Sequence, residues 1–210
     1  MSHPSSSANR SAPGDFWDAR YMAEDAVYGD APNAFFRDCL SVLTPARILL
    51  PGDGEGRNGL HAAAEGWSVR TVDASGVGVS KAEAHALSLG VSLEAEQGDV
   101  RIWEPDEVFD AVALCYLHLQ EEDRFGFHRR VCSWLRPGGT LILEGFGPGQ
   151  MAFDSGGPKS LSMLFSVDML DSDFEELERE VLMTQQVVLD EGPHHQGRAE
   201  VTRLVARKPL

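Results

Sequence analysis

The sequence predicts one α/β domain with a doubly wound, mostly parallel sheet, and three observations support this fold class. From residue 45 onward, short apolar segments typical of buried strands alternate with segments of helical character. The segment 109–116 is almost entirely apolar, which indicates a central strand covered on both faces. A length of 210 residues fits one such domain better than two.

The chain before the sheet has two parts. Residues 1–14 are rich in Ser, Pro and Ala and lack the apolar stretch of a signal peptide. We therefore expect a disordered tail over 1–14 and a single domain over 15–210. An aromatic cluster at helical spacing follows at 16–21, and a short helix is expected over 34–42.

Strands and helices then alternate. Strands are expected over 48–50, 68–72, 91–95, 109–116 and 140–143; helices are expected from Arg57 to before Gly66, before Gly90, and from Glu121 to Leu135. Helical segments are expected again between Leu161 and Leu177. The last two strands, 181–189 and 199–207, are joined by 191–198, and so short a loop predicts antiparallel pairing.

The charge balance limits the possible partners. The chain has 33 acidic and 18 basic residues, a formal net charge of -15, which repels phosphate backbones and anionic lipids. We expect a small-molecule partner, and neither nucleic acid nor a membrane; the oligomeric state stays open. No apolar run is long enough to span a bilayer. Cys39, Cys115 and Cys132 show no paired or metal-type spacing, which favours reduced cysteines in a cytoplasmic protein without a metal.

Three glycines follow the first expected strand. Gly52, Gly54 and Gly56 let the backbone approach a ligand closely and leave free N–H groups at the start of the next helix. A plain turn needs only one such glycine, so this loop predicts a cofactor site. The same stretch fits the dinucleotide pattern G-x-G-x-x-G over 54–59. Asp73 lies at about the distance along the chain that is expected for the acid that binds the ribose. The loop alone therefore leaves NAD and S-adenosylmethionine both open.

Three further features favour S-adenosylmethionine. Asp99, between Gly98 and Val100, follows the third strand, where an acid suits the exocyclic amine of adenine. A Pro-Gly-Gly turn at 137–139 leads directly into the fifth strand. The chain closes with a hairpin where a dehydrogenase has its second nucleotide-binding half.

These motifs, taken in order, resemble those of a class I S-adenosylmethionine-dependent methyltransferase, in the branch similar to tellurite-resistance and thiopurine methyltransferases. The motifs are Trp17-Asp18-Ala19-Arg20-Tyr21, Tyr28-Gly29 with Pro32-Asn33, Gly52-Asp53-Gly54-Glu55-Gly56-Arg57-Asn58, Val72-Asp73-Ala74-Ser75, Cys115-Tyr116-Leu117-His118-Leu119, Leu135-Arg136-Pro137-Gly138-Gly139, and Glu191-Gly192 with His195-Gln196-Gly197. The resemblance covers 16–208.

The resemblance implies a seven-stranded sheet with the last strand antiparallel, and a cofactor site across its edge. Ribose would bond to Asp73, adenine would lie near Asp99 and Val100, and the methionine carboxylate would lie over the glycine loop. The candidate cofactor-binding residues are Trp17, Tyr21, Gly52, Asp53, Gly54, Gly56, Arg57, Asn58, Asp73, Ala74, Ser75, Asp99, Val100 and Tyr116.

One departure from the family stands at the end of the first strand. Family members place an acid there, which helps to hold the cofactor's ammonium group, whereas this chain has Leu50 followed by Pro51. The ammonium then needs another acceptor, a backbone carbonyl or a carboxylate such as Asp53. This departure favours weak binding of the cofactor, an altered pose of the cofactor or a loss of activity.

The acceptor side is expected beyond the carboxyl ends of the strands, where open parallel sheets bind ligands. If the sixth strand is parallel to the others, the loop 191–198 emerges at this edge and brings Glu191, His194 and His195 to the acceptor pocket. A solvated polar hairpin explains these residues equally well. We nevertheless take Glu191 and His195, with His118, as the candidate catalytic residues.

Other interpretations of single residues stay open. His118 can accept a proton, but a packing or capping role is favoured. Trp17 and Tyr21 share one helical face and either cover the sulfonium or dock their helix on the core. Cys115 is favoured as a core residue over a nucleophile, because no activating base is evident.

The function hypothesis is in-line methyl transfer to a small, soft or deprotonated acceptor, such as a thiol or a chalcogen oxyanion. The enzyme would contribute proximity, alignment and exclusion of water, and an anionic acceptor needs no general base. A cofactor-binding sensor or scaffold without catalysis is the second hypothesis. An NAD-dependent oxidoreductase is the third.

Overall fold

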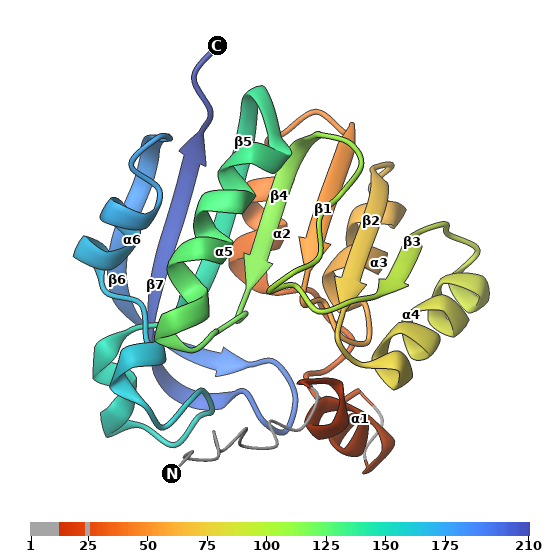
Figure 1. Ribbon diagram of the computed structural model, residues 1–210. Helices are drawn as coiled ribbons and strands as arrows, with labels where there is room; N and C mark the ends of the chain where they lie inside the picture. Colours follow the sequence, from red (N-terminus) through yellow and green to blue (C-terminus); the bar gives the residue numbers. More distant parts are fainter. Residues whose placement is uncertain (1–12, 24–25) are drawn as a thin grey trace, which may run out of the picture.

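A computed structural model describes residues 13–23 and 26–210 of the chain. Its described part is built around a seven-stranded sheet with the strand order β3-β2-β1-β4-β5-β7-β6. Helices cover both faces of this sheet (Figure 1). Residues 1–12 of the expected tail lie outside the described residues, and Pro13 and Gly14 begin the first helix.

The direction of the strands matches the expected topology. The strands are β1 (Arg47–Pro51), β2 (Ser68–Asp73), β3 (Glu94–Gln97), β4 (Phe109–Cys115), β5 (Leu135–Phe146), β6 (Glu178–Asp190) and β7 (Gln196–Arg207). Strands β1 to β5 pair in parallel, and β7 is antiparallel to both β5 and β6. It follows that β6 runs in the same direction as β1 to β5. Its carboxyl end therefore reaches the same edge of the sheet.

The two larger of three apolar clusters in the described residues lie on the two faces of the sheet. The helices are α1 (Pro13–Ala23), α2 (Ala34–Leu40), α3 (Arg57–Ala64), α4 (Gly76–Leu89), α5 (Glu121–Trp134) and α6 (Val167–Asp173), with 3-10 turns η1 (Pro148–Ala152) and η2 (Leu161–Met163). One cluster packs Phe36 of α2 and Ala62 of α3 against Ile48. The other packs Phe127 of α5 and Leu170 of α6 on the opposite face.

Helix α1 lies apart from these layers, at the edge where β1, β2 and β4 end (Figure 1). Its polar contacts fix it there. Asp18 accepts a hydrogen bond from Ser75 Oγ at 2.5 Å and another from the Val77 N–H, so that it joins the N-terminal cap of α4. Ser75 itself caps α4 by accepting from the Gly78 N–H. The N-terminal helix is thus attached to the ligand-facing rim.

Local geometry shifts several expected boundaries. Strand β3 begins at Glu94, later than expected, and β4 ends at Cys115 because Tyr116 takes a positive φ of 54°. Strand β5 begins at Leu135 and so includes the expected turn at 137–139, and it extends to Phe146 because β7 pairs with it from Thr140 to Phe146. The β6–β7 loop is shorter than expected.

The short β6–β7 loop has a clear cause. Gln196, Gly197 and Arg198 pair with the end of β6, so only 191–195 form the turn. Two backbone hydrogen bonds close this turn, from Glu191 N–H to His195 O and from His195 N–H to Gly192 O. Among the described residues, no helix combines the length and the apolarity that a bilayer crossing requires.

Candidate functional site

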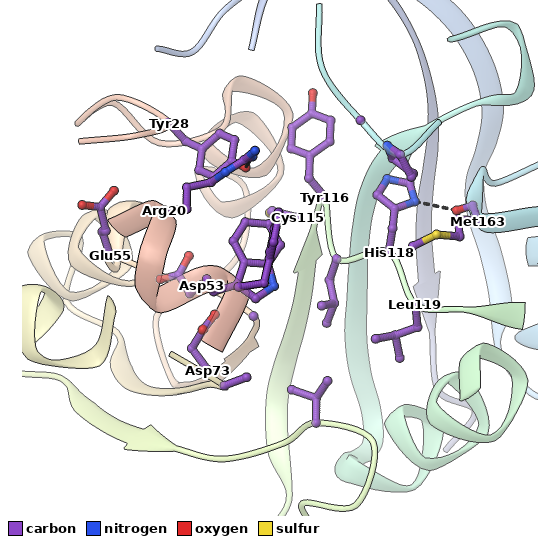
Figure 2. Close-up of a pocket in the computed structure, with 18 of the residues that line it drawn as sticks. Arg20, Tyr28, Asp53, Glu55, Asp73, Cys115, Tyr116, His118, Leu119 and Met163 are labelled. Carbon is purple, nitrogen blue, oxygen red and sulfur yellow. Dashed lines mark hydrogen bonds between the residues drawn. The ribbon is translucent and has the colours of Figure 1, made fainter. Parts of the chain in front are cut away.

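A cavity of about 550 Å³ opens at the carboxyl edge of the sheet. Figure 2 shows side chains from α1, the glycine loop and the end of β4 around it. Its lining residues are Phe16, Trp17, Arg20, Tyr21, Tyr28, Gly29, Gly52, Asp53, Glu55, Arg57, Asn58, Asp73, Ala74, Asp99, Val100, Arg101, Cys115, Tyr116, Leu117, His118, Leu119, Gln120, Asp123, Phe146, Gly157, Pro158, Met163 and His195. This volume lies within the range of about 300–1,000 Å³ typical of small-molecule sites.

The glycine loop and Asp73 are joined by direct hydrogen bonds. Asp73 is buried, and its carboxylate accepts from the Gly54 N–H at 2.9 Å and from the Ser75 N–H at 2.8 Å. Burial raises the pKa of Asp73, and these two bonds oppose that effect. Each carboxylate oxygen keeps a second lone pair, which a ribose diol can use.

The loop needs glycine for reasons of space as well as conformation. Gly52 has a φ of +71°, and a Cβ added there would lie 2.8 Å from the Leu117 side chain. A Cβ at Gly54 would lie 2.2 Å from the Tyr21 hydroxyl. The loop therefore forms a cradle that any larger side chain would fill.

Asp53 is the cavity-lining carboxylate nearest in the chain to Leu50, the position where family members have an acid. Leu50 itself is almost fully buried among apolar side chains. Asp53 lines the cavity and accepts from Asn58 Nδ2 at 2.9 Å and from the Gly59 N–H at 2.8 Å. Burial raises the pKa of Asp53 to about 6, although these hydrogen bonds and Arg57 lower it. A cationic group in the cavity would favour its charged form.

Asp99 lines the cavity, but its carboxylate is already paired. Arg101 binds it through Nε at 2.9 Å and Nη2 at 2.7 Å, and the Arg101 N–H donates to it as well. The Arg101 side chain accordingly holds the pKa of Asp99 below its ordinary value. An adenine amine would therefore share this carboxylate with Arg101, which was not expected from the sequence.

The two aromatic side chains of α1 that were expected at the cofactor site, Trp17 and Tyr21, differ in how deeply they are buried. Tyr21 is buried between Gly54 and Gly78, which favours the docking interpretation for this ring. Trp17 is only partly buried, stacks on Tyr21 with ring centroids 5.8 Å apart, and lines the cavity. Arg20 lies over the Trp17 ring and donates to the Tyr28 hydroxyl.

Both ring nitrogens of His118 are occupied. Nδ1 lies 2.7 Å from the Met163 carbonyl, and Nε2 accepts from the Phe146 N–H at 3.0 Å, which specifies a neutral ring protonated on Nδ1. Burial lowers the pKa of His118 to about 4. The ring also stacks on Phe165. This geometry argues against the candidate catalytic role and favours the packing interpretation.

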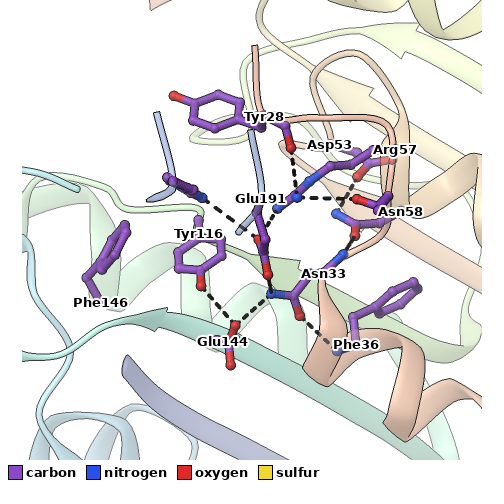
Figure 3. Close-up of polar contacts among 12 residues, drawn as sticks. Tyr28, Asn33, Phe36, Asp53, Arg57, Asn58, Tyr116, Glu144, Phe146 and Glu191 are labelled. Atoms are coloured by element: carbon purple, nitrogen blue, oxygen red, sulfur yellow. Dashed lines mark hydrogen bonds and ion pairs between the residues drawn. The ribbon is translucent and has the colours of Figure 1, made fainter. Parts of the chain in front are cut away.

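A buried polar network lies behind the cavity (Figure 3). The Asn33 side chain is fully buried, and its Nδ2 donates to Glu144 at 2.6 Å and to Glu191 at 3.1 Å. Glu144 also accepts from the Tyr116 hydroxyl and from Arg203 Nε. These contacts join the segment before α2 to strand β5 and to the β6–β7 loop.

His195 stands between this network and the cavity. This residue lines the cavity, and its ring packs against Tyr116, Tyr28 and Phe146, with centroid separations of 4.4, 4.6 and 5.2 Å. We call these four residues the aromatic wall. Burial lowers the pKa of His195, although Glu191 raises it.

The structure gathers most, but not all, of the expected site residues around one cavity. Asp73 and Asp99 open into the same space, together with Gly52 and His195. The expected residues Gly54, Gly56, Ser75, Glu191 and His194 are not part of the lining.

Several lining residues were missed in the sequence. Tyr28 and Arg20 fell inside recognised motifs but carried no assigned role, and Arg101 stands two residues after Asp99. Burial raises the pKa of the Cys115 thiol well above its ordinary value, which agrees with a core role rather than a nucleophile. The described cysteines are free of disulfides.

Comparison with known proteins gives a consistent picture. Residues 48–139 match the family model of a methyltransferase domain. The chain is 32% identical over 114 residues to phosphoethanolamine N-methyltransferase 3 of Arabidopsis thaliana, a match that covers 53% of this chain. The match spans only 23% of that longer relative.

Solved structures show the same fold at low sequence identity. A structure from work on the conversion of a disulfide bond into a thioacetal group during echinomycin biosynthesis has a TM-score of 0.74, at 20% identity and with 93% and 91% of the two chains covered. TehB from Haemophilus influenzae has a TM-score of 0.70 at 17% identity, covering 93% and 66%. The [4+2]-cyclase SpnF has a TM-score of 0.70 at 18% identity, covering 94% and 95%.

Proposed function

We propose that the chain is a class I, S-adenosylmethionine-dependent methyltransferase that transfers a methyl group from this cofactor to a small-molecule acceptor. One observation carries the proposal. The glycine loop after β1, Asp73 after β2 and Asp99 with Val100 after β3 all border the same cavity. The closing β6–β7 hairpin disfavours the NAD alternative, since it replaces the second nucleotide-binding half of a dehydrogenase.

The residues present fit S-adenosylmethionine. The glycine cradle allows close approach of the methionine part, and Asp73 offers free lone pairs to the ribose hydroxyls. Val100 and Leu117 provide apolar surface for the adenine. Asp53 is the carboxylate available for the ammonium group in place of an acid at Leu50.

The chain's own residues bring the two reactants together and exclude water. The bound cofactor supplies an electrophilic methyl group on a positively charged sulfur. Trp17 and the aromatic wall border the remainder of the cavity, where their faces attract positive charge and keep water out. Proximity and alignment in such a site can lower the barrier by several kcal/mol.

The proposal of a small-molecule acceptor is supported by the cavity more than by the names of the relatives. The Arabidopsis relative is named for phosphoethanolamine, which is a small molecule, but the match spans only 23% of that relative. The size and the aromatic lining of the cavity support the same class.

A second candidate is cofactor binding without methyl transfer. Leu50 supports it, because the usual first-strand acid is missing and Asp53 is already engaged by Asn58 and Gly59. The similarity to the [4+2]-cyclase SpnF shows that this fold also serves other chemistry. Binding of the cofactor with no transfer to thiols, phenols, amines or chalcogen oxyanions would favour this candidate.

Calorimetric titration with S-adenosylmethionine tests the proposal. We expect saturable binding to the wild-type protein, and about 10- to 100-fold weaker binding to Asp73→Asn, the loss typical of a hydrogen bond to a charged group. Asp106→Asn is the matched control, because Asp106 is exposed and pairs with Arg70 away from the cavity. An absence of heat with the wild-type protein would exclude both candidates.

A further inference from the structure

Glu191 faces His195, which is part of the aromatic wall, from the side away from the cavity lining. Glu191 Oε2 lies 3.9 Å from His195 Nδ1, and both side chains are buried. Within the described residues, Nδ1 is a buried nitrogen without a hydrogen-bond partner. His195 also lines the cavity. Since Nδ1 is buried opposite Glu191, Nε2 is the ring nitrogen that can take a proton from a bound molecule.

Glu191 is held firmly from two other directions. Arg57 Nη2 donates to Glu191 Oε2 at 2.7 Å, and Asn33 Nδ2 donates to Oε1 at 3.1 Å. Arg57 is fixed in turn by the carbonyls of Tyr28 and Ala31. Burial raises the pKa of Glu191, but His195 and Arg57 outweigh this effect and keep its pKa below the ordinary value. The carboxylate is therefore both charged and oriented (Figure 3).

His195 differs from the other histidine that lines the cavity. His118 uses both ring nitrogens in hydrogen bonds to the backbone, whereas His195 keeps Nδ1 free opposite a carboxylate. A carboxylate behind one ring nitrogen fixes the tautomer and supports a positive charge on the ring. Such bonds are often long before a ligand is bound, which agrees with the 3.9 Å separation.

We propose that Glu191 and His195 act as a carboxylate–imidazole pair that deprotonates the acceptor, and that Arg57 is a positioning residue that holds Glu191. Glu191 keeps the neutral ring protonated on Nδ1, so that Nε2 has a lone pair for the acceptor's proton. This inference rests on the proposed function. It assigns a protic acceptor, such as a phenol, thiol or amine, rather than one that is already anionic when it binds.

The proposed step is balanced in atoms and electrons. The acceptor's X–H bond breaks and its proton passes to Nε2 of His195. The electron pair of the acceptor forms the new bond to the methyl carbon, while the pair of the broken carbon–sulfur bond stays on sulfur. The imidazolium so formed faces the Glu191 carboxylate, and its proton returns to solvent after product release.

Several charged and titratable groups act on His195. Glu191 raises its pKa, whereas Arg57 and His194 lower it in addition to burial. His118 lies close enough for an electrostatic interaction with it, and the Tyr28 and Tyr116 rings pack against it. The pair hypothesis therefore predicts opposite shifts on removal of Glu191 and of Arg57.

Nuclear magnetic resonance of the full chain with isotope-labelled histidine tests this pair directly, without an acceptor. Loss of one signal set in His195→Gln assigns the ring. In the wild type we expect the Nδ1–H tautomer at neutral pH. Glu191→Gln should lower the pKa of His195 by about one unit and weaken this tautomer preference, because an opposite charge is removed. Arg57→Met should raise the pKa of His195.

Control variants test whether a change in the pKa of His195 could arise from misfolding. Glu178→Gln and Arg37→Met change exposed residues away from the cavity and should leave His195 unchanged. The double variant Arg57→Met with Glu191→Gln removes both buried charges together, so it avoids an unpaired one. Its His195 pKa should lie between those of the single variants. Arg57→Lys keeps the charge and should stay close to the wild type.

Two results would overturn the pair: an Nε2–H tautomer in the wild type, or a His195 pKa that Glu191→Gln does not move. In methyl-transfer assays, Glu191→Gln should lower kcat at least tenfold with little change in KM for phenols, thiols or amines. It should leave an anionic chalcogen acceptor nearly unaffected. The proposed function fails separately, if the wild type does not bind S-adenosylmethionine at all.

Discussion

Gly29 and Gly192 pack backbone against backbone, and this contact joins the segment after α1 to the β6–β7 loop. Both residues have a positive φ, of 73° and 85°. A Cβ added at Gly192 would lie 2.4 Å from the Gly29 nitrogen. The contact places Tyr28 against His195, so two motifs from opposite ends of the chain build one wall of the cavity.

Gly192→Ala should therefore destabilise the fold by about 2–5 kcal/mol, as the sum of backbone strain and overlap with Gly29. Urea unfolding measures this loss. Gly90→Ala is the matched control, because Gly90 also has a positive φ but has open space around it. It should lose only about 1–2 kcal/mol. Equal losses for the two variants would show that the close approach is unimportant.

Asn33→Ser should cost about 2–4 kcal/mol of unfolding free energy. Serine keeps a side-chain oxygen for the N-cap of α2 but loses the amide donor shared by Glu144 and Glu191. Asn33→Asp has nearly the same size and should cost more, because it places a third carboxylate beside two buried ones. Urea unfolding at pH 7 ranks the variants. A wild-type stability for Asn33→Asp would contradict the network.

Arg101→Met should bring the pKa of Asp99 back up toward its ordinary value, because the bidentate partner that lowers it is lost. A carboxyl carbon titration by magnetic resonance measures this. A carboxylate whose pKa is lowered in the folded state stabilises the protein at pH values above its ordinary pKa. This stabilisation is lost as the pH falls through the folded-state pKa. The variant should therefore lose less stability on acidification, and an unmoved Asp99 would refute the pairing.

His118→Gln should flatten the pH dependence of stability between pH 6.5 and about 4. The folded His118 stays neutral down to about pH 4, whereas the unfolded residue takes up a proton near pH 6.5. The contribution of His118 to the free energy of unfolding is fully present above pH 6.5. It decreases as the pH drops toward 4, by up to about 3 kcal/mol.

Urea unfolding of the wild type and of His118→Gln at several pH values checks this. His128 and His195 also have lowered pKa values, so the slope should be reduced rather than abolished. Identical slopes for the two proteins would show that the pKa of His118 is not lowered in the folded state. Arg37→Met is the matched control, because its exposed side chain lies outside the cavity.

Much of the fold follows from local patterns in the sequence. The apolar run of β4, the Gly90 terminus of α4 and the short final loop each depend on residues close in the chain. Such signals predict the elements, the strand directions and the edge of the sheet that binds ligands. The boundary at Tyr116 was wrong, because its positive φ is stabilised by contacts with Glu144 that lie outside the segment.

The sequence by itself determined the strand and helix pattern, the glycine loop and the placement of Asp73 and Asp99 at one edge, because these depend on local periodicity and on strand direction. Only the tertiary structure decided which side chains meet. The Asn33 contacts with Glu144 and Glu191, the pairing of Arg57 with Glu191, and the occupied nitrogens of His118 join residues far apart in the chain. Their hydrogen bonds depend on packing geometry to within a few tenths of an ångström, which no local pattern carries.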